Sequence, residues 1–271
     1  MYLTVDIGGT KTLLALMTKS GKITKSIKFP TPTDYEEFKQ LLADNIANIT
    51  TSPFTLTCSS APAKIDHERG IAEAFGNLDW KNIPIRDDIR TITKTPVLLE
   101  NDTKLAGLSE ARLLEPVRKK VLYLTVSTGI GSVLVVNNKI DTDLQDSEVG
   151  FMLFERDGKL VPWQSFASGK AIVKRFGKRA SEIDDPKTWE IISKDIALGL
   201  IDVIANVQPD IVIIGGGVGS YFNKFKKPLL KELKEYENPM VPIPPVIGAR
   251  RPEEAVIYGC YEMIKDYEKQ R

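Results

Sequence analysis

Histidine and cysteine are nearly absent from this chain of 271 residues. His67 is the only histidine, and Cys58 and Cys260 are the only cysteines. A Ser-His-Asp or Cys-His catalytic arrangement and a multi-histidine metal site are therefore excluded unless His67 takes part, and its loop setting favours a solvated role. The two cysteines stand far apart, in segments that resemble a buried strand and a buried helix, so we expect core thiols. Any general base is expected to be a carboxylate or a lysine.

The chain also lacks a long apolar run and an excess of charge. No stretch approaches the roughly 18 consecutive apolar residues of a membrane span, and the first residues run directly into a predicted strand without the features of a secretory signal. With 37 Lys and Arg against 36 Asp and Glu, there is no global field to attract nucleic acid or an acidic membrane. We therefore expect a cytoplasmic protein with neither of these partners. Its 42% hydrophobic residues suffice for one large or two medium domains.

A glycine-rich turn directly follows the first predicted strand. The segment from Asp6 to Thr12 lies between the apolar runs 2–5 and 13–17. Its glycines let backbone amides approach a ligand, and a neighbouring Thr-Lys pair suits phosphate oxygens. The same segment is also compatible with an ordinary glycine-rich hairpin. Its candidate phosphate-binding residues are Asp6, Gly8, Gly9, Thr10 and Lys11.

A second round of the same pattern begins at residue 121. A predicted strand over 121–126 runs into the turn from Ser127 to Gly131 and out through a strand over 133–136. Asn137-Asn138 then suits a two-residue hairpin turn, and residues 139–140 open a further strand. Both rounds read strand, glycine-threonine turn, strand, tight turn, strand. We interpret the chain as an internal duplication of a whole domain.

The third glycine-rich turn, Gly215 to Gly219, follows a strand predicted over 210–214. A P-loop is absent, because no Gly-x-x-x-x-Gly-Lys-Ser/Thr occurs in the chain. The third turn also misses the Rossmann spacing, because Ser220 takes the place of the last glycine. Three turns in related settings favour a nucleotide held between two duplicated domains of another architecture.

Local signals predict several further elements. Thr33 to Glu36 has the spacing of a capping box before an amphipathic helix that reaches Ile49. A buried strand over 96–100 ends in Asn101-Asp102 and a helix. Residues 59–82 and 141–168 carry few periodic signals, and we expect loops there. The terminal helix is expected to start at Arg251-Pro252-Glu253.

In order and spacing these motifs resemble the ROK family of repressors, uncharacterised reading frames and sugar kinases. Asp6 to Lys11 matches its first phosphate motif, and Ser127 to Gly131 matches its second. Pro209 to Gly217 resembles its adenosine motif, and Gly76 to Trp80 and Glu100 to Asp102 resemble its sugar-contacting segments. The match runs in family order from residue 2 to the last helix. The resemblance implies an α/β chain of two duplicated ribonuclease-H-like domains, of the actin-like ATPase and sugar kinase fold, flanking a cleft.

The resemblance implies an ATP- and Mg²⁺-dependent kinase that transfers the γ-phosphate to a primary hydroxyl of glucose or a related hexose. The expected N-terminal domain, with the sugar-binding loops, comprises 1–115 plus 252–271, and the expected C-terminal domain, with the nucleotide site, comprises 116–251. The expected partners are a small-molecule sugar, a nucleotide and further copies of the chain, as a dimer. A polyphosphate donor, which the lysines within 224–234 would suit, and a catalytically silent sugar or nucleotide sensor stay open. Because only five residues precede Asp6, we do not expect a repressor.

Phosphoryl transfer needs a base near the attacking hydroxyl and neutralisation of the phosphate charge. By motif match Asp102 is the catalytic base, although Asp at such a position is also a common helix N-cap. Asp6 is expected to orient Mg²⁺ through water, since Mg²⁺ keeps several waters and prefers one or two carboxylates; alternatively it stabilises the turn. Lys11 is equally compatible with a solvated hairpin lysine, and the amide and carboxylate side chains with loop stabilisation. The remaining expected contacts are Asn77, Asn101, Asp102, Glu148 and Gln164 to sugar, Thr128, Gly129 and Gly131 to phosphate, and Gly215, Gly216 and Gly217 to adenosine.

The chain departs from the family pattern in one region. Most members carry Glu-x-Gly-His and then a cysteine-rich zinc segment, whereas this chain has Glu148-Val149-Gly150-Phe151 and no cysteine or histidine over 154–163. We therefore expect no zinc site, and Phe151 cannot replace the imidazole. The family glutamate after the cysteines aligns with Gln164, which keeps one acceptor and gains donors. The sugar, whether glucose, mannose, fructose or an N-acetylhexosamine, is left open.

Overall fold

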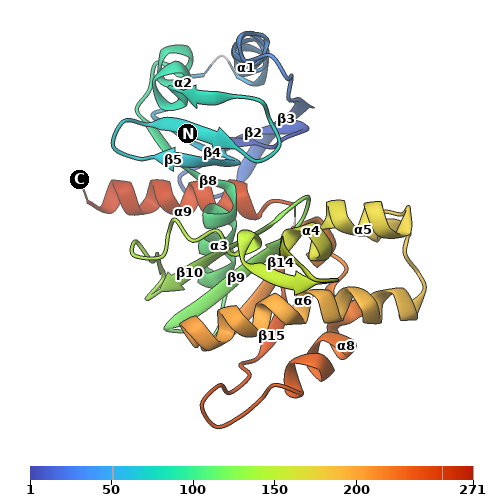
Figure 1. Cartoon of the computed structure of the whole chain (residues 1–271). Coiled ribbons are helices and arrows are strands. Elements are labelled where there is room, and N and C mark those ends of the chain that lie inside the picture. Colours follow the sequence, from blue (N-terminus) through green and yellow to red (C-terminus); the bar gives the residue numbers. More distant parts are fainter. Residues whose placement is uncertain (51, 252, 271) are drawn as a thin grey trace. The chain divides into compact units, whose positions relative to one another are not determined.

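The computed structural model describes residues 1–50, 52–251 and 253–270 (Figure 1). The chain divides into two compact units, Met1–Ser109 with Glu254–Arg271, and Glu110–Glu253. The division expected from the sequence lay at 115/116 and 251/252. Over the described residues, none of the helices combines the length and the apolar character needed to span a bilayer.

Unit 1 is built on a five-stranded sheet in the order β3-β2-β1-β4-β8. Strand β1 pairs antiparallel with β2 and parallel with β4, while β3 is antiparallel to β2 and β8 is parallel to β4. The strands are β1 (Tyr2–Ile7), β2 (Lys11–Met17), β3 (Ile23–Pro30), β4 (Leu56–Ala61) and β8 (Val97–Asn101).

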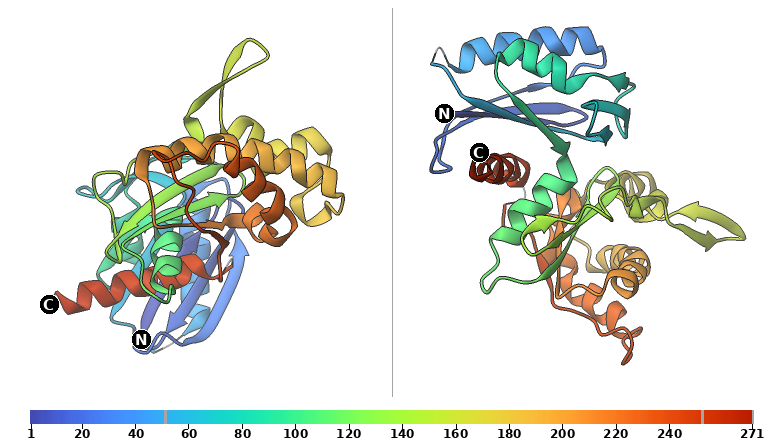
Figure 2. Two further views of the ribbon diagram at one scale, coloured as in Figure 1. Left: turned by 90° about the horizontal axis from the view of Figure 1, so that it is seen from below. Right: turned by 90° about the vertical axis from the view of Figure 1, so that its left-hand side faces the viewer.

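Helices cover both faces of this sheet (Figures 1 and 2). Phe38 and Leu42 of α1 and Ile85 and Ile89 of α2 are buried against one face. Leu105 of α3 and residues of α9, including Ile257 and Ile264, are buried against the other. The two faces thus enclose separate apolar clusters, which hold the strand ends in place. These helices are α1 (Tyr35–Ile49), α2 (Ile85–Thr93), α3 (Asp102–Arg112) and α9 (Ala255–Lys269).

Unit 2 repeats this topology. Its sheet has the order β11-β10-β9-β14-β15, with β10 antiparallel to both β9 and β11, and with β14 parallel to both β9 and β15. Position for position, the pairings are those of unit 1, which confirms the predicted duplication. The strands are β9 (Lys120–Val126), β10 (Ile130–Val136), β11 (Lys139–Ile140), β14 (Ile211–Gly215) and β15 (Val246–Gly248).

The core of unit 2 lies between the sheet and two helices, α6 (Pro186–Val207) and α8 (Phe222–Lys234). Asp185 caps α6 by accepting hydrogen bonds from the backbone of Lys187 and Thr188, and Pro186 occupies the first helical position. The remaining elements are η1 (Val149–Phe151), β12 (Leu153–Arg156), β13 (Lys159–Pro162), α4 (Gln164–Ala167), α5 (Gly169–Phe176), η2 (Ala180–Glu182) and α7 (Gly216–Gly219).

The two segments expected to be loops contain strands. Residues 59–82 complete β4 and form a three-stranded sheet of β5 (Ala63–Asp66), β6 (Ile71–Phe75) and β7 (Lys81–Ile83). The segment 141–168 contains the β12–β13 hairpin, whose Asp157-Gly158 turn has φ of 52° and 75°. Left-handed residues at both turn positions are typical of a two-residue hairpin.

Two helix starts also differ from expectation. The cap of α1 is Asp34, which accepts from the backbone of Glu37 at 2.8 Å, so the predicted capping box beginning at Thr33 is wrong by one residue. Helix α9 begins at Ala255. Pro252, in the middle of the predicted start and at the predicted domain boundary, lies outside the described residues.

Candidate functional site

The first glycine turn connects β1 and β2 of unit 1. The backbone N–H of Gly8 donates to the carbonyl of Lys11 at 3.0 Å, and a Cβ on Gly8 would lie 2.7 Å from that carbonyl oxygen. A Cβ on Gly9 would lie 2.8 Å from the Cβ of Asn77. Side chains larger than hydrogen are therefore excluded at both positions by contacts with neighbouring atoms. The turn and the loop that carries Asn77 lie directly against each other.

Asp6 stands near the end of β1, just before this turn. Its carboxylate accepts a hydrogen bond from the Ser60 hydroxyl at 2.8 Å, and the Ser60 oxygen in turn accepts from the backbone N–H of Ile7 at 3.1 Å. Burial raises the pKa of Asp6 to about 6, although Ser60 and the charge of Lys28 act in the opposite direction. Strand β4 therefore fixes the orientation of this carboxylate through a single hydroxyl.

Asp102 is the first residue of α3, directly after β8. The helix cap, however, is provided by Asn101, whose Oδ1 accepts from the backbone of Thr103 at 2.9 Å and of Lys104 at 3.3 Å. Asp102 Oδ1 accepts from Thr103 at 2.7 Å. Burial, followed by the negative charge of Asp6, raises the pKa of Asp102 to about 7. A carboxyl group that titrates near neutrality is suited to accept a proton from a hydroxyl.

Asn101 is engaged at both ends of its amide. Besides capping α3 with its oxygen, it donates from Nδ2 to the carbonyl of Ala63 at 3.2 Å. The side chain thus ties the β5 strand to the start of α3. Its geometry is that of a residue that holds Asp102 and the neighbouring loop in place.

The second glycine turn, in unit 2, connects β9 and β10. The backbone N–H of Ser127 donates to Gly129 at 2.9 Å, and the Ser127 carbonyl accepts from Gly169 at 2.6 Å. Gln164 Oε1 accepts from the backbone of Ile130 at 3.4 Å and lies 2.7 Å from where a Cβ on Gly129 would stand. Gln164 therefore packs directly on the turn, with its oxygen facing the backbone.

The segment with Glu148 lies on the same turn. A Cβ on Gly150 would lie 2.3 Å from the Ile130 carbonyl oxygen, so only glycine permits this approach. The backbone of Phe151 donates to the carbonyl of Glu148 at 3.0 Å, and the Phe151 side chain is 60% exposed. Unit 2 thus brings together the second turn, Gln164 and the Glu148 segment.

The third turn packs on the end of β9. Gly216 has φ of +83°, and a Cβ there would lie 2.5 Å from Thr125 Oγ1 and 2.7 Å from the Val126 carbonyl oxygen. Gly217 is less crowded, since the nearest atom to its Cβ position is Ser127 Oγ at 3.7 Å. The second and third turns are therefore neighbours within unit 2.

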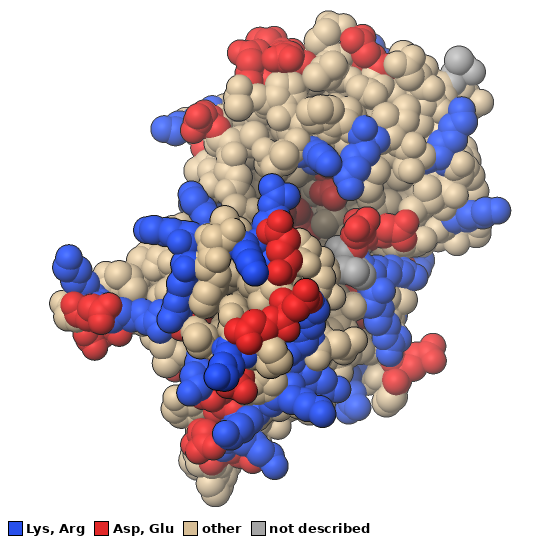
Figure 3. Space-filling model, turned by 90° about the vertical axis from the view of Figure 1, so that its right-hand side faces the viewer, with Lys and Arg blue, Asp and Glu red and all other residues tan. Residues whose placement is uncertain are grey.

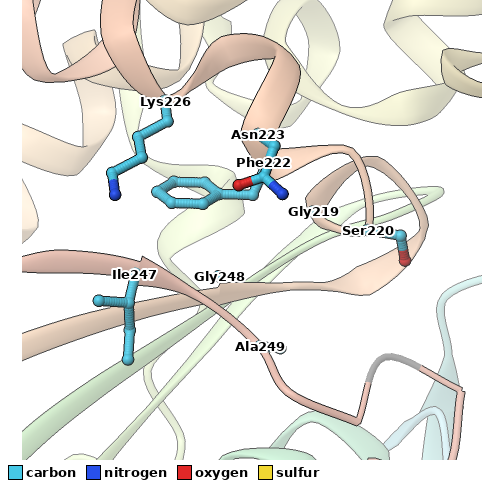
Figure 4. A pocket seen from close by; sticks show the side chains of 8 residues that line it. All are labelled: Gly219, Ser220, Phe222, Asn223, Lys226, Ile247, Gly248 and Ala249. Atoms are coloured by element: carbon cyan, nitrogen blue, oxygen red, sulfur yellow. The ribbon is translucent and has the colours of Figure 1, made fainter.

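A cavity of about 220 Å³ opens beside the third turn, between the first turns of α8 and the end of β15 (Figure 4). Its lining combines an aromatic ring and aliphatic side chains with hydroxyl, amide and ammonium groups, a combination typical of small-ligand sites. From the sequence, only Gly219 in the third turn and Lys226, among the lysines considered for polyphosphate, were singled out in this lining. The spacing of three polar residues, 220, 223 and 226, was the available signal. The lining residues are Gly219, Ser220, Phe222, Asn223, Lys226, Ile247, Gly248 and Ala249.

A family model described as the ROK family matches residues 2–266. The chain belongs to the ROK family. The match covers both units and every motif named above, and it confirms the resemblance that the sequence motifs indicated.

Relatives match this ROK chain over most of their own length. The glucokinase of Streptomyces coelicolor is 23% identical to this chain, and the alignment covers 97% of this chain and 96% of the glucokinase. The fructokinase of Lactococcus lactis is 26% identical, and the alignment covers 80% of this chain and 79% of the fructokinase. This chain is also similar to the structure of a ROK glucokinase from Streptomyces griseus in complex with glucose and AMPPNP. The TM-score is 0.84 at 23% identity, and the superposition covers 96% of this chain and 98% of the glucokinase. This similarity confirms the predicted fold class.

Within this ROK chain, the described residues contain no group of three or more His, Cys, Asp and Glu side chains placed to hold a metal ion. A magnesium ion bound mainly through water and nucleotide phosphates needs only one or two carboxylates. Asp6 fits that requirement, because its carboxylate is oriented by Ser60 beside the first glycine turn.

Proposed function

We propose that this chain is an ATP- and Mg²⁺-dependent sugar kinase that phosphorylates a hexose primary hydroxyl. The observation that carries the proposal is the raised pKa of Asp102, whose carboxyl group lies directly after strand β8. Burial and the negative charge of Asp6 raise this pKa to about 7. Relatives named glucokinase and fructokinase, and a similar structure with bound glucose and AMPPNP, support this choice of substrates.

In the proposed reaction, Asp102 accepts the proton of the sugar hydroxyl while that oxygen bonds to the γ-phosphorus. The bond from the γ-phosphorus to the oxygen bridging the β- and γ-phosphates breaks, and ADP leaves. The backbone amides of the first and second glycine turns stabilise the phosphate oxygens. Asp6 would orient a water-coordinated Mg²⁺, which supplies charge neutralisation to the phosphates. Thr10, Lys11 and Thr128 are proposed as further phosphate contacts, and Gly131 completes the second turn.

The sugar is proposed to contact Asn77, Asp102, Glu148 and Gln164. Because the oxygen of Gln164 accepts from Ile130, the amide NH₂ is the end that we assign to the sugar. Asn101 uses both ends of its amide within the protein, so we assign it mainly to the placement of Asp102. We assign the nucleoside to Gly215, Gly216, Gly217 and the cavity beside them.

The two alternative hypotheses, a polyphosphate donor and a catalytically silent sensor, have less support. A polyphosphate donor would use the lysines of α8, but Lys224 donates to the carbonyl of Ile183 and pairs with Asp184 at 2.8 Å. Basic and acidic side chains are interspersed on the face shown in Figure 3 rather than gathered by sign. A silent sensor would not need a buried carboxyl that titrates near neutrality.

The proposal is tested by ADP formation with Mg²⁺, ATP and a panel of hexoses and N-acetylhexosamines, with polyphosphate as an alternative donor. Asp102→Asn should reduce turnover by about 10²–10⁴-fold while sugar binding, followed by calorimetry, persists. Asp44→Asn, which changes an exposed aspartate of α1, is the matched control and should leave turnover intact. No sugar-stimulated turnover in the wild type, or full turnover in Asp102→Asn, would refute the proposed function.

A further inference from the structure

The β12–β13 hairpin projects from the body of unit 2 in both views of Figure 2. One side of it is open to solvent, with Leu153 60% and Leu160 67% exposed. A two-stranded hairpin has little stability alone, and residues 154–163 contain no cysteine or histidine that could tie it to a metal. Contacts with the rest of unit 2 must therefore hold it in place.

Asp195 of α6 provides those contacts. Its side chain is 6% exposed, and its two carboxylate oxygens pair with different arginines, Arg156 of β12 at 2.6 Å and Arg175 of α5 at 2.9 Å. Its backbone carbonyl accepts from the indole N–H of Trp163 at 2.9 Å. One residue of α6 thus contacts the hairpin, the residue before α4, and α5. Burial raises the pKa of Asp195, and both arginines oppose that rise. Each oxygen of the buried carboxylate therefore has a positively charged partner.

Two of these three segments also contact the second glycine turn. Trp163 directly precedes Gln164, whose side chain packs on Gly129 and accepts from Ile130. Helix α5 begins at Gly169, whose N–H donates to the Ser127 carbonyl at 2.6 Å.

Apolar packing fixes the same segments. Trp163 is fully buried, and its ring occupies the space where a Cβ on Gly199 would stand, 2.2 Å away. The guanidinium of Arg156 lies 4.1 Å from the centre of the Phe166 ring, within α4. Arg156 therefore joins Asp195 on one side to α4 on the other, so contacts of one side chain link the hairpin, α4 and α6.

We infer that Asp195, with Arg156 and Arg175, is a positioning residue that holds Gln164 and the second glycine turn in their binding geometry. The inference rests on the proposed function for its effect on catalysis, but the placement of the turn is measurable without it. Asp195 acts through Gln164 and Gly169 and touches no substrate.

The test compares Asp195→Asn with Asp184→Asn, a control that removes an ion pair of unit 2 whose carboxylate is 92% exposed. Hydrogen exchange followed by mass spectrometry should accelerate about tenfold or more over residues 127–131 and 148–169 in Asp195→Asn only. In turnover assays the KM for ATP should rise about tenfold, with a smaller change in kcat, and Asp195→Glu should partly restore it.

Arg156→Gln provides a second route, because the Arg156 side chain is 36% exposed and we expect its replacement to leave the fold intact. It should loosen the same peptides, and Asp195→Asn combined with Arg156→Gln should loosen them little more than Asp195→Asn alone. Equal exchange over 127–131 in Asp195→Asn and Asp184→Asn would overturn the inference. A wild type without kinase activity would instead refute only the proposed function, since the exchange result stands by itself.

Discussion

The negative charge of Asp6 raises the pKa of Asp102, adding to the effect of burial, so the ionisation of each of these two carboxyl groups affects the other. One precedes the first glycine turn and the other begins α3. Repulsion between two ionised carboxylates in a partly buried setting favours a state with a proton on one of them. A cation bound beside Asp6, as proposed, would relieve that repulsion, so metal binding and ionisation of Asp102 would favour each other.

This coupling predicts how stability depends on pH in metal-free protein. The pKa values of Asp6 and Asp102 are raised to about 6 and about 7, above the unfolded value of about 4. Between about pH 4 and pH 7 the folded state therefore binds more protons than the unfolded state. The stability from the protonated forms is fully present below about pH 4 and is lost as pH rises through 6 and 7.

Asp102→Asn removes the ionisation of one partner. At pH 8 in EDTA the variant should be more stable than the wild type by on the order of 2 kcal/mol, and the difference should close as pH falls to about 4.5. Urea unfolding at several pH values measures this. If the difference in unfolding free energy between Asp102→Asn and the wild type is constant with pH, or grows at low pH, the pKa of Asp102 is not raised in the folded state.

The sequence predicted the repeated strand pattern because each strand pair is local and its turn residues are explicit. Asn137-Asn138 indeed has φ of 52° and 62°, as a two-residue hairpin turn requires. The β12–β13 hairpin carried an equivalent signal at Asp157-Gly158 that was missed, because its strands alternate weakly and expose apolar side chains. The β5–β7 sheet was missed for another reason: its strands have three to five residues, and packing rather than local propensity stabilises them.

The candidate site residues could be named from motifs, but their individual tasks could not. Asp102 was compatible with a helix cap as well as with catalysis, and only the hydrogen bonds to Thr103 and Lys104 assign the cap to Asn101 instead. The role of Asp195 depends on arginines 39 and 20 positions away along the chain. No local pattern marks such a contact, because it arises from the packing of α6 against other elements.

The third glycine turn offers a matched pair of substitutions. Gly216→Ala places a Cβ 2.5 Å from Thr125 Oγ1 at φ of +83° and should destabilise the protein by about 1–3 kcal/mol. Gly217→Ala has 3.7 Å of clearance and should be nearly neutral in stability. Thermal and urea unfolding compare the two variants, and nucleotide affinity should fall more in the first. Equal destabilisation by both would show that the backbone of the turn differs from the one described.

Removing metal with two different chelators distinguishes a requirement for magnesium from a requirement for zinc. EDTA should abolish turnover and added Mg²⁺ should restore it, whereas a zinc-selective chelator should have no effect. Asp6→Asn should raise the Mg²⁺ concentration for half-maximal turnover about tenfold or more, because one carboxylate supplies most of the protein's contribution to the ion. Ser60→Ala, which removes the hydroxyl that orients Asp6, should have a smaller effect of the same kind. Inhibition by the zinc-selective chelator alone would contradict this assignment.

Trp80 holds the loop that carries Asn77. Its ring is 4% exposed and lies about 5 Å, centre to centre, from those of Tyr35, Phe38 and Phe75, and its indole N–H donates to the Thr33 carbonyl at 2.7 Å. Trp80→Phe keeps an aromatic ring but loses this hydrogen bond, which should cost about 1–2 kcal/mol. Because Asn77 lies against Gly9, a shifted loop should also raise the KM for sugar several-fold with little change in kcat.

Trp189→Phe is the matched control for this prediction. Trp189 is equally buried, donates from its indole to the Ile183 carbonyl at 3.1 Å, and stacks on Phe225 in the core of unit 2. The free energy of unfolding should fall by a similar amount in both variants, but the KM for sugar should rise only in Trp80→Phe. If both substitutions raise that KM equally, the effect is one of general stability, and the Asn77 loop has no separate part in sugar binding.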